Sequence, residues 1–382
     1  MSVATTSMEI QWVSTADRIA CRSPQGAVFD DTKEHWREAV LRLLNLNEEQ
    51  GRAWVESVAT LSLAADSRPF FDRSPEERLK VLVQASQCVF PRPSEFTSLQ
   101  VPALALGAPI DQVWFRGLRH DPFYAVVGNR QLRHGILAHR QQGRWELVKP
   151  LPYEEEYFEG NQLGVGYGRY REQAGWRLEK AARLVRQVRA IGQFLGRNLG
   201  SDVRLLDVGA GYGYFRKAAS DSGWTTDGVE ISHHAAAVAR QEFGMDTFVG
   251  TLQDYAREGA GHSYDVLTLF DVVEHVEDPV SLLETVRSLL KPEGLCVIRT
   301  PNLLAIDGEV FGSYYHSLKM EHLHYFSATS LCQAMELAGL RPAFVTTESN
   351  VLRGFLGPAL SSFSACLRGS DLFAVGLAPD NE

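Results

Sequence analysis

Length, composition and charge describe a globular chain and exclude several functions. The 382 residues are 45% apolar and 22% charged, which allows two or three domains with large hydrophobic cores. The formal net charge of −9 argues against a nucleic-acid binder or a membrane-surface binder, because polyanions bind basic faces. No apolar run reaches the length of a membrane span and the N-terminus lacks the pattern of a signal peptide, so we expect neither.

The cysteines indicate a reducing environment. Five are present, an odd number, and they are scattered without any CxxC pair: Cys21, Cys88, Cys296, Cys332 and Cys366. This pattern is typical of reduced thiols rather than of a disulfide framework or a zinc site. We therefore expect a cytoplasmic protein.

The first part of the chain predicts an arm followed by an accessory domain. Residues 1–29 lack strong periodicity and are interpreted as an N-terminal arm. Apolar residues recur at helical spacing over 30–90, whereas 97–150 contain short apolar runs separated by turn signals. We predict an α+β accessory domain over 30–150, helical in its first part and β-containing in its second.

The remainder of the chain predicts an α/β domain. Residues 151–199 contain an aromatic segment and a connecting helix, and from 200 to 382 strands alternate with helices. Such alternation favours a mostly parallel, doubly wound, Rossmann-like sheet with helices on both faces. The predicted strands are 204–208, 225–230, 247–249, 265–270, 295–300, 343–347 and 372–377, and the predicted helices are 214–222, 232–243, 279–290 and 328–338.

A glycine-rich loop after the first of these strands is the clearest binding signal. Gly209, Gly211 and Gly213 alternate after a strand that contains Asp207, and glycine permits a tight turn close to a ligand. The spacing does not satisfy the G-x-G-x-x-G pattern of dinucleotide sites, which disfavours NAD and FAD. Glu230 ends the second strand, where an acid accepts hydrogen bonds from ribose hydroxyls. Together these features suit S-adenosylmethionine.

Four segments in order resemble the class I S-adenosylmethionine-dependent methyltransferases. The segment 207–213 resembles their first motif and 264–279 their fourth-strand motif, while 289–295 and 299–302 resemble the fifth strand and its surroundings. The resemblance extends from about residue 200 to 347. It is strongest to small-molecule enzymes, including ubiquinone-pathway O-methyltransferases and natural-product tailoring enzymes, and it implies the seven-stranded class I fold with S-adenosyl-L-methionine as cofactor.

The same resemblance implies a set of cofactor-binding residues. Glu230 is expected to hold the ribose, and Gln253 and Asp254 to flank the adenine beside Leu252. The methionine moiety is expected to lie against the glycine loop and the end of the fourth strand, with tyrosines as a lid, which adds Asp207, Gly209, Gly211, Gly213, Phe270, Asp271, Tyr167 and Tyr170. Two residues depart from the family pattern: Glu293 replaces a glycine, and Tyr212 replaces a small residue and is large enough to crowd the methionine.

Two groups of histidines are candidates for proton removal. His275 forms an i, i+3, i+4 set with Asp271 and Glu274, which would share one face of a helix. Such a set binds a divalent ion in some ubiquinone-pathway relatives, but a structural role is the favoured interpretation and no metal is predicted. His322 and His324 follow the fifth strand, at the edge where open α/β sheets bind ligands, and are predicted as a general base.

The alternative for His322 and His324 is a packed loop whose imidazoles bond to the backbone. Two other polar residues of this region, Asn302 and Tyr315, are predicted to border the substrate. Residues 114–149 are rich in arginine, histidine and aromatic side chains. This stretch suits either an anionic substrate or, as the favoured interpretation, a solvated β-surface or an interface that pairs with the acidic C-terminal half.

The leading hypothesis is therefore methyl transfer to a small-molecule acceptor in a biosynthetic pathway. The acceptor would be anionic if residues 114–149 bind it. The N-terminal domain would then mediate a homodimer or bind a partner subunit. Two alternatives stay open. One is an enzyme on the same fold that catalyses an elimination or cyclisation instead of methylation, since fold does not fix function. The other is a non-catalytic subunit that binds a partner protein.

Overall fold

The computed structural model describes the parts of the chain that surround one large site. These parts are residues 11–14, 18–23, 26–32, 110–118, 121–141, 144–150, 152–153, 155–159, 170–258, 264–305, 308, 315–348 and 367–380. Residues 33–90 of the predicted helical region and Tyr167 lie outside the described residues, whereas residues 30–32 of that region belong to a strand. Within the described parts, no helix is long and apolar enough to cross a membrane.

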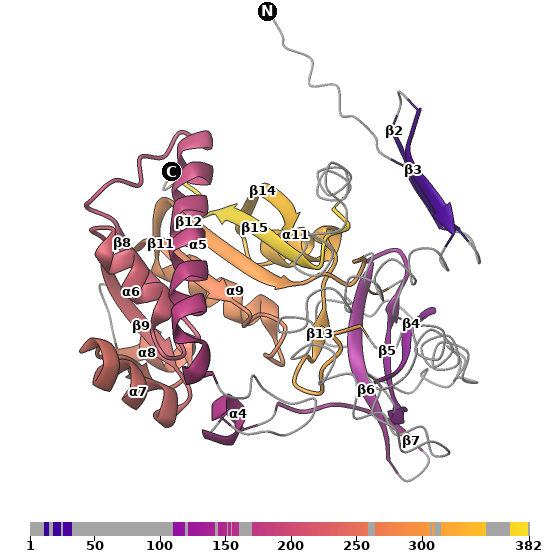
Figure 1. The fold of residues 1–382 in the computed structure, drawn as a ribbon, viewed down its shortest axis with the longest axis horizontal. Coiled ribbons are helices and arrows are strands. Elements are labelled where there is room, and N and C mark those ends of the chain that lie inside the picture. Colours follow the sequence, from indigo (N-terminus) through magenta and orange to yellow (C-terminus); the bar gives the residue numbers. More distant parts are fainter. Residues whose placement is uncertain are drawn as a thin grey trace, which may run out of the picture.

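A seven-stranded sheet forms the centre of the fold, as predicted (Figure 1). Its strand order is β10-β9-β8-β11-β12-β15-β14. The strands from β10 to β12 are parallel, whereas β15 is antiparallel to both of its neighbours. The bounds are β8 Arg204–Val208, β9 Thr225–Glu230, β10 Phe248–Val249, β11 Tyr264–Phe270, β12 Leu290–Pro301, β14 Arg341–Glu348 and β15 Asp371–Leu377.

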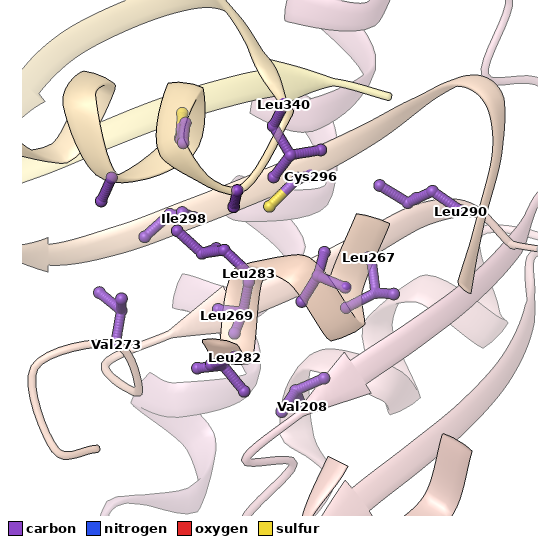
Figure 2. Close-up of a cluster of buried hydrophobic side chains, with 14 of the residues drawn as sticks. Val208, Leu267, Leu269, Val273, Leu282, Leu283, Leu290, Cys296, Ile298 and Leu340 are labelled. Atoms are coloured by element: carbon purple, nitrogen blue, oxygen red, sulfur yellow. The ribbon is translucent and has the colours of Figure 1, made fainter. Parts of the chain in front are cut away.

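Helices cover both faces of this sheet because successive strand residues point to opposite sides. One face packs on α5 (Ala174–Phe194), α6 (Tyr214–Asp221) and α7 (His233–Phe243). The other face packs on α8 (Leu252–Glu258), α9 (Pro279–Leu289) and α11 (Ala328–Leu337). Figure 2 shows the second cluster, in which Leu267 and Ile298 of the sheet lie near Leu283 of α9.

Local signals in the sequence explain where several helices begin. Ser232 starts α7 by accepting a hydrogen bond from the Ala235 backbone N–H, and Asp278 caps α9 in the same way ahead of Pro279. Ser327 caps α11 and forms a reciprocal capping box with Ser330. These caps fix the ends of the loops that border the site.

A second, antiparallel sheet lies beside the first and includes a strand from the C-terminal half. Its strands are β4 (Gln112–Leu118), β5 (Asp121–Asn129), β6 (His134–Gln141) and β7 (Arg144–Leu147), within the predicted β-containing region. The short strand β13 (His324–Tyr325) pairs with β6 and lies between the two sheets in Figure 1. The predicted boundary near residue 150 is thus crossed by backbone pairing.

The N-terminal arm contains strands that the sequence did not predict. β1 (Gln11–Ser14), β2 (Arg18–Ser23) and β3 (Gly26–Thr32) form a three-stranded antiparallel sheet. The apolar residues of β2 and β3 are consecutive rather than alternating, so the period-2 pattern of a half-buried strand is absent.

Candidate functional site

A cavity of about 580 Å³ lies at the carboxyl ends of β8, β9 and β11, the edge where open α/β sheets bind ligands. Its volume is within the range of small-molecule sites. The predicted site residues that line it are Asp207, Gly209, Gly211, Glu230, Gln253, Phe270, Asp271, Tyr170 and His275. Gly213, Asp254, His322 and His324 are not among the lining residues.

The glycine loop lines the cavity. Its backbone adopts a conformation that residues other than glycine rarely adopt. Gly209, Gly211 and Gly213 have φ angles of 69°, 52° and 81°, in the left-handed region that favours glycine. A Cβ on Gly209 would lie 2.5 Å from a methyl carbon of Val272. Gly213 instead begins α6 and faces Ala239, which explains its position outside the cavity.

Glu230 is held rigidly at the end of β9. Its side chain is buried, and its carboxylate oxygens accept hydrogen bonds from the backbone N–H groups of Gly211 at 2.7 Å and Ser232 at 2.9 Å. Burial raises the pKa of Glu230 above its ordinary value, against the opposing effect of these N–H donors. The next residue, Ile231, is 50% exposed and lines the same cavity, which leaves an apolar surface beside the carboxylate.

The residues predicted to flank an adenine separate into two groups. Leu252 and Gln253 line the cavity, together with Thr251. Asp254 does not, because its carboxylate accepts hydrogen bonds from the hydroxyl of Thr251 at 2.6 Å and from its backbone N–H at the exposed start of α8. The Thr251 hydroxyl in turn accepts from the Asp254 backbone N–H at 3.1 Å, so Thr251 and Asp254 form a reciprocal capping box at the start of α8.

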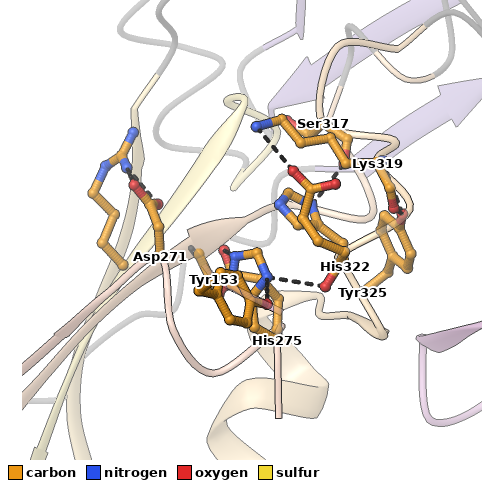
Figure 3. Close-up of polar contacts among 11 residues, drawn as sticks. Tyr153, Asp271, His275, Ser317, Lys319, His322 and Tyr325 are labelled. Carbon is orange, nitrogen blue, oxygen red and sulfur yellow. Dashed lines mark hydrogen bonds and ion pairs between the residues drawn. The ribbon is translucent and has the colours of Figure 1, made fainter. Parts of the chain in front are cut away.

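Two acids at the far end of the glycine loop have different environments. Asp207 is buried and accepts a hydrogen bond from the Thr268 hydroxyl at 2.6 Å, and burial raises its pKa to about 7. Asp271 has a φ of 57° and forms two short contacts with the Arg299 guanidinium, at 2.6 and 2.9 Å (Figure 3). Arg299 also pairs with Asp371 of β15 at 2.5 Å. Asp271 is therefore neutralised by Arg299.

Aromatic residues form a wall over the loop. Tyr170 lines the cavity, and its hydroxyl lies 3.7 Å from the position of a Cβ on Gly211. Tyr157 and Phe158, from the short helix α4 (Glu155–Glu159), line it as well. The sequence pointed to this aromatic segment, although only Tyr170 was assigned a role within the described residues.

Tyr212 does not crowd the cavity, contrary to the expectation from its size. It is fully buried on the other side of the loop, where its hydroxyl donates to Glu159 Oε1 at 2.6 Å and lies 2.9 Å from His234 Nε2. Its ring stacks on Phe158 at 5.1 Å between ring centroids. The left-handed turn at Gly211 directs the next side chain away from the cavity, so Tyr212 joins the loop to α4 and α7.

His275 is the only one of the three predicted catalytic histidines that lines the cavity. Its Nδ1 lies 2.9 Å from both the Glu321 carbonyl oxygen and the Tyr153 hydroxyl (Figure 3). Because a carbonyl only accepts, Nδ1 carries the hydrogen and Nε2 carries the lone pair. Burial lowers the pKa of His275 to about 4, so the ring is neutral at neutral pH. Tyr153 had no signal in the sequence, because it reaches the site through a linker after β7.

His322 and His324 lie behind the cavity wall. His322 Nδ1 donates to the Ser317 carbonyl at 2.8 Å, and its ring packs edge-on against His275. His324 belongs to β13, where its Nδ1 lies 3.1 Å from His134 Nε2. Burial lowers the pKa of both residues. These contacts match the packed-loop alternative rather than a base that touches substrate.

Asn302 and Tyr315 are likewise buried and do not line the cavity. The Asn302 amide donates to the carbonyl oxygens of Leu367 and Gly369, and the Tyr315 hydroxyl donates to that of Ser370. Both residues therefore connect the loop after β12 to the start of β15, away from the predicted substrate border.

The segment that contains Glu274 and His275 is a turn, so it does not form the helical face expected for Asp271, Glu274 and His275. Instead, one ligand atom each from Glu274, His275 and His322 lie within 4.8 Å of one another. Burial raises the pKa of Glu274 to about 8, and its Oε2 accepts from Thr300 at 2.9 Å. A protonated carboxyl beside two neutral imidazoles accounts for this cluster, and the absence of a metal stays a prediction.

The strand order and the cavity at the strand ends define an α/β domain with a small-molecule-sized site, and sequence comparison identifies the family of this part of the chain. Residues 177–343 match a family model described as a methyltransferase domain. The chain is 32% identical over 107 residues to the ubiquinone biosynthesis O-methyltransferase of Actinobacillus pleuropneumoniae serotype 5b, a match that covers 26% of this chain and 46% of the relative. The Thiobacillus denitrificans enzyme of the same name is 34% identical over 116 residues, or 28% and 50% of the two chains.

The chain spans about half the length of these curated relatives. Among solved structures, a SAM-dependent methyltransferase from Archaeoglobus fulgidus aligns with a TM-score of 0.38 and 17% identity, covering 50% of this chain and 94% of that one. From the sequence match, this chain carries a class I S-adenosylmethionine-dependent methyltransferase domain, distantly similar to ubiquinone O-methyltransferases.

Proposed function

We propose that this protein transfers a methyl group from S-adenosylmethionine to a hydroxyl oxygen of a small molecule. The observation that carries the proposal is a single cavity lined both by Gly209, Gly211 and Glu230 and by the Tyr153–His275 pair. The sequence matches to relatives named as O-methyltransferases support oxygen as the methylated atom. A biosynthetic pathway and a cytoplasmic location belong to the same proposal.

The residues of the glycine loop and those near Glu230 suit the cofactor. Glu230 would accept hydrogen bonds from the ribose hydroxyls, and Ile231 and Leu252 would contact the adenine. Gly209 and Gly211 would let the backbone approach the methionine moiety, because a side chain there would be strained. When bound, the cofactor supplies an electrophilic methyl group, and the protein contributes position and exclusion of water.

The Tyr153–His275 pair suits an acceptor hydroxyl. Nε2 of His275 carries the lone pair and would take the hydroxyl proton, since its ring is neutral above about pH 5 by virtue of the lowered pKa. Tyr153 accepts from the His275 Nδ1–H, which leaves its own hydrogen free to donate to the acceptor. The aromatic ring of Tyr157, which packs edge-on against Tyr153 at 4.7 Å, favours a planar, apolar acceptor body.

The test is methyl transfer from labelled S-adenosylmethionine to a panel of hydroxylated aromatic and aliphatic acids, with product detection by mass spectrometry. Changing His275→Ala should lower turnover by about 100- to 10,000-fold, the usual range for loss of a general base, and leave the Kd of the cofactor within about threefold. The matched control is His233→Ala at the exposed start of α7.

Methyl transfer at the wild-type rate by the His275→Ala variant would contradict the assignment of the base. A wild-type product that has lost or rearranged bonds without gaining a methyl group would instead favour the elimination or cyclisation alternative. Binding of a partner protein without any turnover would favour the non-catalytic subunit. The proposal also includes an anionic acceptor and a homodimer that forms through the N-terminal region.

A further inference from the structure

The turn that carries His275 is bonded to a short segment that leads into β13. The Glu274 carbonyl oxygen accepts hydrogen bonds from the backbone N–H groups of Leu323 and His324, at 2.8 and 3.1 Å. The His275 ring itself donates from Nδ1 to the Glu321 carbonyl oxygen at 2.9 Å. The position of the His275 ring therefore depends on where this segment lies.

The antiparallel sheet sets the position of that segment. β13 pairs with β6, with His324 opposite Ile136, and lies between the two sheets (Figure 1). The Leu137 backbone N–H of β6 donates to the Leu323 carbonyl oxygen at 2.9 Å. The turn of His275 is thus connected, through β13, to a sheet that precedes the methyltransferase domain in the chain.

Two buried histidines connect the antiparallel sheet to the same turn through their side chains. His134 begins β6, and its Nε2 lies 3.1 Å from Nδ1 of His324. Nε2 of His324 lies 3.3 Å from the carbonyl oxygen of Glu277, two residues after His275. Because a carbonyl only accepts, His324 carries its hydrogen on Nε2, and Nε2–H of His134 donates to the lone pair on Nδ1 of His324. Burial lowers the pKa of both rings, so both are neutral at neutral pH.

We propose that His134 is a positioning residue for His275. Its hydrogen bond to His324 holds that ring on the Glu277 carbonyl oxygen, so that the turn is fixed after His275 as well as before it. This inference rests on the proposed function, in which His275 is the base. A base must lie within hydrogen-bond reach of the proton that it removes, so a displaced turn would slow the reaction and leave the cofactor site unchanged. The sequence did not indicate this role, because His134 and His324 are 190 residues apart.

Heteronuclear NMR of the full chain with isotope-labelled histidine side chains tests the geometry at neutral pH. The nitrogen shifts report which ring nitrogen carries the hydrogen, and the wild type should carry it on Nε2 in His134 and His324 and on Nδ1 in His275. In His134→Leu, the hydrogen on His275 Nδ1 should exchange with water about tenfold faster, because one of the bonds that hold the turn is lost. His134→Gln keeps an N–H donor and should restore slow exchange.

Turnover separates positioning from cofactor binding. With a hydroxylated acceptor that the wild type methylates, His134→Leu should lower kcat by about 10- to 100-fold. The KM of the acceptor and the Kd of S-adenosylhomocysteine should stay within about threefold of the wild type. His134→Gln should recover most of kcat. His233→Leu, at the exposed start of α7, is the matched control and should behave like the wild type.

A folded His134→Leu variant with wild-type kcat and wild-type exchange at His275 would overturn the proposal. So would a wild-type spectrum with the hydrogen of His324 on Nδ1, a result that does not require the variant to fold. An equal loss of kcat in folded His134→Leu and His134→Gln would also overturn it, because that result describes a structural role. Failure of the wild type to bind S-adenosylhomocysteine or to methylate any acceptor would instead refute the proposed function, and the exchange measurement would still test the connection between His134 and His275.

Discussion

Replacement of Glu230 by glutamine tests the cofactor site with the least structural disturbance. The carboxylate is buried and accepts two backbone hydrogen bonds, from Gly211 and Ser232. A glutamine keeps the shape but has one acceptor oxygen, and its NH₂ group would face a backbone N–H or a ribose hydroxyl. Hydrogen bonds to charged groups contribute about 1.5–3 kcal/mol, so affinity for S-adenosylhomocysteine should fall by about 10- to 150-fold.

Isothermal titration calorimetry of the full chain measures this loss. Thermal unfolding of the same samples separates weaker binding from a misfolded loop. Glu284→Gln, on the exposed face of α9, is the matched control and should bind like the wild type. A folded Glu230→Gln protein whose affinity lies within twofold of the wild type would refute the assignment of Glu230 to the ribose.

Two further predictions concern Asp207 and Tyr212. Burial raises the pKa of Asp207 to about 7, so its carboxyl is about half protonated at pH 7. A cationic cofactor should favour the ionised form of this carboxyl. Binding of S-adenosylmethionine at pH 6.5 should therefore release a proton. Calorimetry in buffers of different ionisation enthalpy should detect that release in the wild type, and persistence of the release in Asp207→Asn would refute its origin. Tyr212→Phe removes the hydrogen bonds to Glu159 and His234, so it should lower the free energy of unfolding by about 1–2 kcal/mol. Cofactor affinity should change by less than about threefold. A loss of binding with no loss of stability would contradict the orientation of the Tyr212 side chain away from the cavity.

The central sheet could be predicted because its signals are local. Strands β8 and β11 contain short apolar runs, and helices α7, α9 and α11 begin at capping residues visible in the sequence. The glycine loop and Glu230 were predicted from the same local signals, because the end of a strand fixes where the adjoining residues lie. That is why these residues line the cavity.

The histidines were harder to predict because their positions depend on distant contacts. His324 lies in β13, whose partner β6 precedes it by more than 180 residues, and neither His322 nor His324 lines the cavity. Nothing in the sequence near Leu323 announces this pairing. His275 reaches the cavity because its own turn directly follows β11.

The remaining parts of the site arise from charge pairing across the sheet. Asp271 was expected to share a helix face with Glu274 and His275, yet it pairs with Arg299 of β12, which also pairs with Asp371 of β15. Such an arrangement depends on strand order and register, which a single sequence does not display. The division into an arm, an accessory domain and a methyltransferase domain likewise stays a prediction, although β13 already joins the last two.

The most direct test of the whole account is calorimetry of the intact chain with S-adenosylmethionine and S-adenosylhomocysteine. We expect both ligands to bind at a ratio of one per chain, with a Kd on the order of micromolar, which corresponds to a binding free energy of about −8 kcal/mol. Both affinities should fall in the Glu230→Gln variant. Absence of binding by the folded wild type at millimolar ligand would contradict the central claim that this cavity is a cofactor site.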